Sequence, residues 1–504
     1  MTGYRQSVAI VLVLAVLPLT GCRVGPKYRQ PAPLAQAPPV SYKEAPAQFA
    51  DTGEWKVAQP QDAMLQGNWW EIFGDPELNA LEDKLNIDNQ TIKQYFANFM
   101  EARTLIAQAR SELYPTLGVG PGFTRSKSSG NLTNSATANT GHESSITSAP
   151  MDASWAPDLW GKVRNLISEE QYNAQISAAD LEGERLTEQG SLAVYFFEIR
   201  GQDALQAVYD QTVVADRKEL DLTRAQYETG VGDEVSVVEA ENALQNVQAA
   251  STALGVARAQ YEHAIAVLIG ANPSSFSIPV RALNASPPPV PIGVPSQLLE
   301  RRPDVAASER MLAAANAQIG IADAAFYPTL TLTAAAGFQS STLKHLFDWP
   351  SRFWSIGPTA SETIFDAGLR RATVNEFIEA YNSDVAGYRQ TVLTAFQEVE
   401  DALAAVRILS QQVGQQQEAV QSAQRVVDLE IARYETGVDP YIDVVTVETT
   451  LLADQQALAT VQMQAMTESV DLIQALGGGW DRTQLPTPKA VSKNLTAAES
   501  TIQR

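Results

Sequence analysis

The side chains that most often perform catalysis or bind metal ions are scattered through this sequence. The three histidines, His142, His263 and His345, have no spacing typical of a metal site, and the single cysteine does not join them. Residues 118–122 are rich in glycine, but no helix is expected after them to direct N–H groups at a phosphate. The carboxylates recur on solvated helix faces rather than as an enclosed pair. The sequence therefore predicts no enzymatic activity, no metal site and no cofactor.

Cys22 is the only cysteine in the chain, and the residues before it have the order of a secretion signal over 1–21. Arg5 supplies a positive charge, and Val8–Leu17 is an apolar run too short to span a bilayer. Leu19-Thr20-Gly21-Cys22 then resembles the lipobox of bacterial lipoproteins, in which the cysteine is acylated. By the same resemblance, Arg23 rather than aspartate favours the outer membrane. An ordinary signal peptide with a chance cysteine is the alternative.

The charge of the chain argues against a nucleic acid partner, and its hydropathy argues against a transmembrane helix. The chain has 58 acidic and 36 basic residues and would repel a phosphate backbone, so we expect no nucleic acid partner. Its 45% of hydrophobic and 19% of charged residues are typical of a folded protein. No segment after the signal has the ~18 consecutive apolar residues of a transmembrane helix. If the mature chain crosses a membrane, it must therefore do so with strands.

The chain contains one structural unit twice. Tyr227-Glu228-Thr229-Gly230-Val231 recurs as Tyr434-Glu435-Thr436-Gly437-Val438, and Tyr114-Pro115-Thr116-Leu117 recurs as Tyr327-Pro328-Thr329-Leu330. These matches stand in the same order in both halves, which indicates a duplication. We therefore expect a signal peptide, an extended tether, a first repeat, a proline-rich linker, a second repeat and a tail, over 1–21, 22–65, 66–272, 273–296, 297–477 and 478–504.

Each repeat is expected to contain one very long helix and a returning helix. From Ile378 to Tyr434, every seventh residue is apolar or aromatic, a period typical of helices that pack along their whole length. The predicted long helices cover 161–229 and 367–436, each about 100 Å long at 1.5 Å per residue. The returning helices cover 234–269 and 441–476. A plain intramolecular coiled coil would satisfy these heptads equally well.

Four predicted strands argue against a plain coiled coil. Leu330, Leu332 and Phe338 alternate with threonine, alanine and glycine, a pattern typical of a strand with lipid on one side and water on the other. Four tryptophans near strand ends suit a membrane interface, and polar segments near 125–145 and 340–350 suit extracellular loops. Pro121 weakens the first strand. The predicted strands cover 115–125, 146–158, 328–339 and 353–365, and the tryptophans are Trp155, Trp160, Trp349 and Trp354.

Two strand hairpins cannot close a barrel, and open strand edges are not tolerated in lipid. The chain must therefore form oligomers if the strands lie in a membrane. Because eight strands would enclose little lumen, a water-filled channel needs at least three chains.

The sequence resembles the TolC-like outer-membrane factors of tripartite, RND-type efflux pumps, in their NodT/OprM-like lipoprotein branch. The resemblance rests on four motifs, the last of which is the doubled Tyr-Glu-Thr-Gly-Val; the others are residues 22–28, 69–78 and 298–305. It implies a mainly α-helical fold with membrane β-strands. Four strands per chain would contribute to a trimeric, twelve-stranded outer-membrane barrel that continues into a long periplasmic helical barrel.

The same resemblance implies partners and functional residues. The partners are two further copies of the chain, outer-membrane lipid, a periplasmic adaptor and an inner-membrane RND-type transporter. Asp439 and Asp443 would form a periplasmic constriction, although Thr446 and Ser236 replace two acidic residues of the prototype and Asp439 replaces its arginine. Helix capping is the alternative role for Asp439. Residues at the helix-turn tips, where the adaptor would bind, are Tyr227, Gly230, Asp233, Tyr434 and Gly437.

The predicted function is a passive exit duct for small toxic compounds such as drugs or metal ions. The inner-membrane transporter would supply the energy, since no nucleotide-binding motif occurs in the sequence. A TolC-like duct for type I protein secretion and a non-channel, lipid-anchored periplasmic coiled-coil scaffold are the alternatives.

Overall fold

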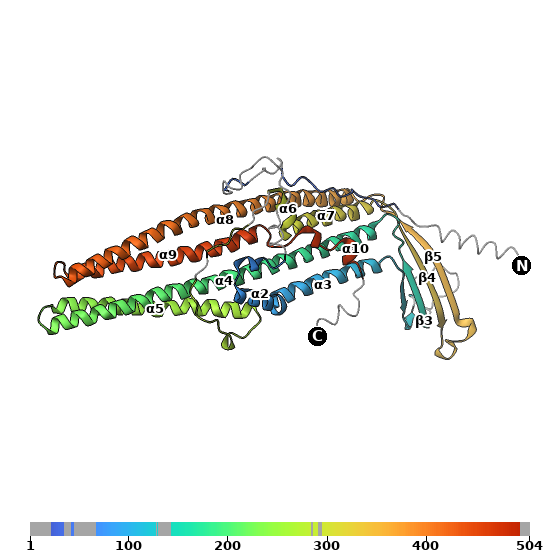
Figure 1. Cartoon of the computed structure of the whole chain (residues 1–504). Coiled ribbons are helices and arrows are strands. Elements are labelled where there is room, and N and C mark those ends of the chain that lie inside the picture. Colours follow the sequence, from blue (N-terminus) through green and yellow to red (C-terminus); the bar gives the residue numbers. More distant parts are fainter. Residues whose placement is uncertain are drawn as a thin grey trace.

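The computed structural model describes residues 22–34, 42–44, 67–127, 129, 143–283, 286–290 and 295–493. The signal peptide predicted over 1–21, most of the tether and the last residues of the tail lie outside this range, and so do parts of the first polar loop, including His142. The molecule is elongated, with long helices running side by side and a small sheet at one end (Figure 1).

Two helical hairpins make up the length of the molecule. In the first repeat, α4 (Lys162–Glu228) turns into α5 (Glu234–Leu268), and in the second, α8 (Leu369–Glu435) turns into α9 (Tyr441–Ala475). At 67 residues each, α4 and α8 are about 100 Å long. Within the described ranges, no helix combines the length and the apolar character that a bilayer crossing requires.

Shorter helices lie against the sheet-side half of the long ones. In the first repeat these are η3 (Trp69–Phe73), α2 (Pro76–Asp88) and α3 (Gln90–Ser111); α6 (Pro295–Arg301) and α7 (Pro303–Ala324) belong to the second. The carboxylate of Asp75 accepts hydrogen bonds from two N–H groups of the first turn of α2 and so fixes its start. Helix α3 packs on α4, and α7 lies between α4 and α8. The tail adds α10 (Pro488–Val491), and short 3₁₀ turns occur at Pro273–Ser275, Leu343–His345, Trp349–Ser351 and Arg482–Gln484.

The sheet is an antiparallel meander with two free edges. Strands β1 (Thr116–Val119) and β2 (Gly122–Lys127) lie end to end along one side of β3 (Glu143–Trp155). On its other side β3 pairs with β4 (Thr329–Ser340), and β4 pairs with β5 (Arg352–Ser361). The sheet thus has four strand positions, with β1 and β2 on one edge and β5 on the other.

The strand limits differ in detail from those expected. The strand predicted over 115–125 is broken at Gly120-Pro121, because proline has no N–H to donate to the ladder. Strand β3 begins at Glu143 rather than at residue 146 and ends at Trp155. Strand β5 ends at Ser361 rather than at residue 365, because Asp366 already receives hydrogen bonds from the N–H groups of Gly368 and Arg370 at the start of α8.

The core has three separate parts along the helices, and the smallest joins α3, α4 and α10. The larger part lies where both hairpins meet the shorter helices, and it includes Trp69, Leu192, Phe196, Val392 and Met466. A smaller cluster lies near the far ends of the hairpins. The helices are joined tightly at the sheet-side half and by a second, limited contact near their tips.

Residues after Cys22 run along the outside of this core. The N–H of Val24 donates to the Trp160 carbonyl at 3.0 Å, and the Tyr28 hydroxyl donates to the Glu309 carboxylate at 2.6 Å. Gly25 has φ +106°, and a Cβ atom there would lie 2.4 Å from the Cα of Gly320. Only glycine fits this close backbone contact, so the segment is fixed to α7 rather than free.

Candidate functional site

Two glycines shape the turns at the tips of the hairpins. Gly230 has φ +76° and Gly437 has φ +75°, and in both turns the N–H of the following valine donates to a helix carbonyl at 2.9 Å. This is the left-handed C-terminal cap that glycine adopts at little cost. No atom within 4 Å would obstruct a Cβ at either position. The backbone conformation, and not lack of space, therefore explains glycine here.

The residues after the two turns differ in role. The Asp233 carboxylate caps α5 by accepting the Ser236 N–H at 2.8 Å, and this bond lowers the pKa of Asp233. In the second turn Pro440 occupies the cap position of α9, and no side chain caps that helix. Asp439 instead forms an ion pair with Arg433 of α8. The alternative that Asp439 caps the following helix is therefore wrong.

Three carboxylates gather at the second tip. Oxygen atoms of Glu430, Asp439 and Asp443 lie within 4.8 Å of one another. The pKa of Glu430 is raised, first by its hydrogen bond to Asp439 and then by burial and by the neighbouring negative charges. With Arg433 as the cation in this group, the local charge stays negative and can attract cations.

Glu430 was not found from the sequence. A signal was available, since Glu430 stands one helical turn before Tyr434 and shares its face of α8. The spacing of the histidines and of the single cysteine, on which the expected absence of a metal site depends, gives no sign of a carboxylate group.

The two tyrosines of the repeated motif behave differently. Tyr434 is half-buried, and its hydroxyl donates to the Gln226 side chain of α4 at 2.5 Å. Its ring also lies 5.3 Å from that of Tyr441. Tyr227, at the matching position of the first repeat, is exposed. Tyr434 thus links the two hairpins, whereas Tyr227 leaves an aromatic ring on the surface of the tip.

Cys22 lies beside the junction between β3 and α4. Its thiol is exposed, and its carbonyl accepts a hydrogen bond from Arg164 at 3.1 Å. Arg164 is held in turn by Asp158 at 3.0 Å. Next to this pair, the Trp160 ring stacks on Tyr327 with centroids 4.8 Å apart. The N-terminal residue of the predicted mature chain therefore stands where the sheet meets the helices.

The sequence matches the profile of the outer membrane efflux protein family over residues 82–271 and 294–478. The chain belongs to this family. It is 30% identical to the probable efflux pump outer membrane protein TtgC of Pseudomonas putida over 471 residues, covering 93% of this chain and 95% of TtgC. It is also 30% identical to the outer membrane protein OprJ of Pseudomonas aeruginosa over 487 residues, covering 95% of this chain and 97% of OprJ.

A solved structure supports the fold of this efflux protein. The CmeC outer membrane channel of Campylobacter jejuni superposes with a TM-score of 0.83 at 23% identity, covering 95% of this chain and all of CmeC. The predicted TolC-like fold and family are therefore confirmed, as is the prediction of an outer-membrane efflux channel that is not an enzyme. The two matched segments are separated at the proline-rich linker, as a duplicated chain requires.

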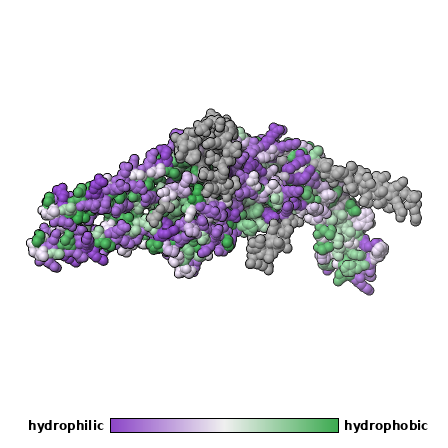
Figure 2. All heavy atoms as spheres, in the orientation of Figure 1, coloured by the Kyte–Doolittle hydropathy of each residue, from purple (hydrophilic) through white to green (hydrophobic). Residues whose placement is uncertain are grey.

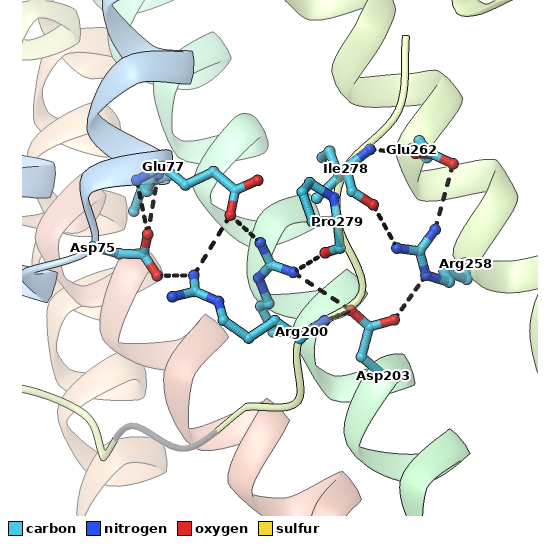
Figure 3. Close-up of polar contacts among 10 residues, drawn as sticks. Asp75, Glu77, Arg200, Asp203, Arg258, Glu262, Ile278 and Pro279 are labelled. Carbon is cyan, nitrogen blue, oxygen red and sulfur yellow. Dashed lines mark hydrogen bonds and ion pairs between the residues drawn. The ribbon is translucent and has the colours of Figure 1, made fainter.

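A buried ionic network in this efflux protein fastens that linker to the first repeat (Figure 3). Arg200 of α4 is only 2% exposed and forms ion pairs with Glu77 and with Asp203, the latter at 3.4 Å. It also donates to the Pro279 carbonyl at 2.7 Å. Asp203 continues the network to Arg258 of α5 at 2.7 Å.

The linker supplies backbone groups to the same network. Arg258 donates to the Ile278 carbonyl at 2.8 Å, and the Glu262 carboxylate accepts the Ile278 N–H at 2.5 Å. Arg281 pairs with Asp75 at the start of α2. The described part of the linker from Ile278 to Arg281 is thus held by α2, α4 and α5 together.

Proposed function

We propose that this chain is the exit duct of a tripartite efflux pump and passively conducts small toxic compounds, such as drugs or metal ions, across the outer membrane. The observation that carries the proposal is the continuity between the sheet and two helical hairpins about 100 Å long. The sheet is suited to a bilayer, and the hairpins are long enough to reach far into the periplasm. The name of its relative TtgC, an efflux pump outer membrane protein, agrees with this reading.

The surface of the sheet suits lipid. Its end of the molecule is largely hydrophobic, whereas the helices carry a mixed surface (Figure 2). Large apolar side chains stand exposed on the strands, a property expected of the outer face of a membrane barrel; they include Leu117, Val119, Phe123, Met151, Trp354 and Ile356. Acyl chains on Cys22 would enter the same bilayer, because Cys22 stands at the base of the sheet.

We further infer that three copies close the barrel, and the contact between the repeats suggests how. Within one chain, Trp160 of the first strand-to-helix junction packs on Tyr327, which begins the second pair of strands. On the outer sides of the chain, Tyr114, which corresponds to Tyr327, is 69% exposed, and Phe365, next to the position that corresponds to Trp160, is 84% exposed. Tyr114 of one copy would lie against Phe365 of the next, beside pairing of the β1 edge with the β5 edge.

The acidic tip supports a gate. Asp439 and Asp443, together with Glu430, would form a ring of negative charge where three copies converge, and such a ring favours cations. The exposed turns beside it would contact the periplasmic adaptor, through Tyr227, Gly230, Asp233, Tyr434 and Gly437. The adaptor and an RND-type inner-membrane transporter would supply opening and energy.

Two experiments test this function. Purified protein should give discrete single-channel currents in planar bilayers, and a lipid-anchored scaffold without a pore would give none. Deletion of the gene should raise sensitivity to drugs or metal ions. Loss of a secreted protein with unchanged sensitivity would instead favour the type I secretion duct.

A further inference from the structure

The two hairpins of one chain touch near their tips where α4 lies against α9. Asp216 and Glu219 of α4 are buried in this contact, with 5% and 7% of their surface exposed. Glu448 of α9 is half-buried and acts on both of them electrostatically. Apolar side chains surround the three carboxylates, namely Leu220, Ala240, Leu244, Tyr441 and Val444.

The carboxylates lack the partners that buried charges need. Asp216 Oδ2 and Glu219 Oε2 are fully enclosed and have no hydrogen-bond partner. In the part of the chain that the structure describes, no ion pair reaches either of them or Glu448. A buried carboxylate without a partner is strongly disfavoured in its ionised form, so a proton must replace the missing partner.

The charged and titratable groups around the three carboxylates do not remove their preference for the protonated form. Lys218, also on α4, lowers the pKa of Glu219, but burial outweighs it and the pKa is raised; Glu435 of α8 raises it further. The phenols of Tyr434 from α8 and Tyr441 from α9 are neutral, and their own pKa values are raised. Helix α5 faces the cluster with Ala240 and Leu244, and its Glu241 is already paired with Arg224 at 2.6 Å.

Protons fit this site better than a metal ion. Among the described residues, the acidic groups close enough to share one ion are Glu430, Asp439 and Asp443 at the tip, and this cluster is not among them. Burial, and then the neighbouring negative charges, raise the pKa of Asp216 to about 6 and that of Glu448 to about 7. The cluster therefore loses its protons near neutral pH.

We propose that Asp216, Glu219 and Glu448 form a proton-binding site that holds the two hairpins of each chain together near the tip. The proposal rests on the proposed function in one respect, that the tip is the aperture of the duct. Asp443 precedes Glu448 on α9, so separation of α9 from α4 also moves this proposed aperture residue. Protonation would keep the aperture narrow, and loss of the protons would favour its opening.

The direction of the pH effect follows from the raised pKa values. When α4 and α9 are in contact, which we call the closed joint, Asp216 holds its proton up to about pH 6 and Glu448 up to about pH 7. In an opened, hydrated joint their pKa values return toward the ordinary 3.8 and 4.5. The closed joint is therefore fully stabilised below about pH 4 and loses this stabilisation as the pH rises to about 7. Above that pH, mutual repulsion of the carboxylates favours separation.

Cysteine labelling measures this opening directly in the full-length, lipid-anchored protein. Val444→Cys places a thiol in the buried joint, and Val231→Cys places one on the exposed turn of the first hairpin. The unaltered protein, whose only cysteine is Cys22 and would carry lipid on its sulfur, gives the background. The ratio of the two labelling rates cancels the effect of pH on thiol reactivity. We expect this ratio to rise by at least about tenfold between pH 5.5 and 8.

Neutral replacements decide whether the carboxylates cause the rise. Asp216→Asn combined with Glu448→Gln should leave the ratio low at both pH values, whereas Glu228→Gln, an exposed position of α4, should leave the rise intact. The proposal would be overturned if the labelling ratio did not change with pH while all three carboxylates were present. It would also be overturned if the rise remained after the double replacement. Leu220→Cys on the facing helix reports the same joint if Val444→Cys impairs folding.

Bilayer currents separate this proposal from the proposed function. Labelling that responds to pH in a protein without currents would reject the duct and leave the proton site standing. Currents from a protein whose labelling ignores pH would reject the site and leave the duct standing.

Discussion

Asp443 is an exposed carboxylate in the first turn of α9, and it stands in a group with Glu430 and Asp439. Arg433 pairs with Asp439 in this group, and the role proposed for Asp443 is to act on ions that pass the aperture. The Asp443→Asn replacement should lower the permeability ratio of cations to anions roughly two- to threefold while preserving the size of the side chain.

Reversal potentials in a salt gradient measure this ratio. Asp83→Asn, an exposed position of α2 far from the tip, is the matched control and should leave the permeability ratio unchanged. Equal potentials for the Asp443→Asn and unaltered channels would remove Asp443 from the aperture.

Arg200 is the residue on which the linker network depends. Replacing it with methionine keeps the aliphatic volume but leaves Asp203, whose side chain is buried, with less compensation. Breaking a buried ion pair from one side costs about 3–5 kcal/mol of unfolding free energy. We therefore expect a clear fall in the thermal unfolding temperature of Arg200→Met.

Arg281→Met is the comparison for Arg200→Met, because half of the Arg281 side chain is exposed although it joins the same network. Exposed pairs contribute about 0–1 kcal/mol. Similar unfolding temperatures for the two variants would show that burial of Arg200 adds nothing to the stability that the network provides.

At the scale of elements, each helix end depends on local conformation as much as on packing. Gly437 holds φ +75° in the turn before α9, and no neighbouring atom restricts a side chain there. Alanine in this backbone conformation costs about 1–2 kcal/mol. In Gly437→Ala we expect amide hydrogen exchange over residues 429–441 to accelerate roughly five- to thirtyfold.

Gly414→Ala is the matched replacement within α8, where space is equally open but the backbone is helical. Alanine stabilises a helix interior by up to about 1 kcal/mol relative to glycine, so exchange there should slow. The same acceleration at both sites would mean that φ at Gly437 is not the reason for glycine.

Helices and strands could be predicted from the sequence wherever a short-range pattern of residues determines them. The heptads from Ile378 to Tyr434 lie within α8, and the alternation after Pro328 lies within β4, because each pattern repeats with the period of its own element. Pro121 also signalled the break between β1 and β2, since the missing donor is a property of one residue.

Other features could not be predicted because they depend on where distant segments meet. Arg200 contacts Glu77 and Pro279, which lie far from it in the sequence and on either side of it. The cluster of Asp216 and Glu219 exists only because α9 brings Glu448 against α4, and no periodicity within either helix encodes that pairing.

At the scale of the whole molecule, each outer side of the chain presents an aromatic ring without a partner ring among the described residues of the same copy. Tyr114 lies exposed next to the β1 edge and Phe365 lies exposed next to the β5 edge, whereas the aromatic contact at the corresponding place inside the chain, Trp160 on Tyr327, is closed. If three copies repeat the internal contact, cysteines at Tyr114 and Phe365 should face each other across each boundary between copies. A chain carrying both Tyr114→Cys and Phe365→Cys should then be joined by a short thiol cross-linker into covalent dimers and trimers on denaturing gels.

Closure of the ring of copies also limits the size of the cross-linked products. A closed ring of three gives a ladder that stops at the trimer, whereas an open chain of copies would continue to larger species. Tyr114→Cys combined with Val231→Cys at the distant tip is the control and should remain monomeric on the gel. Monomers alone from the Tyr114→Cys and Phe365→Cys chain, in preparations that still conduct ions, would show that the copies meet through other surfaces.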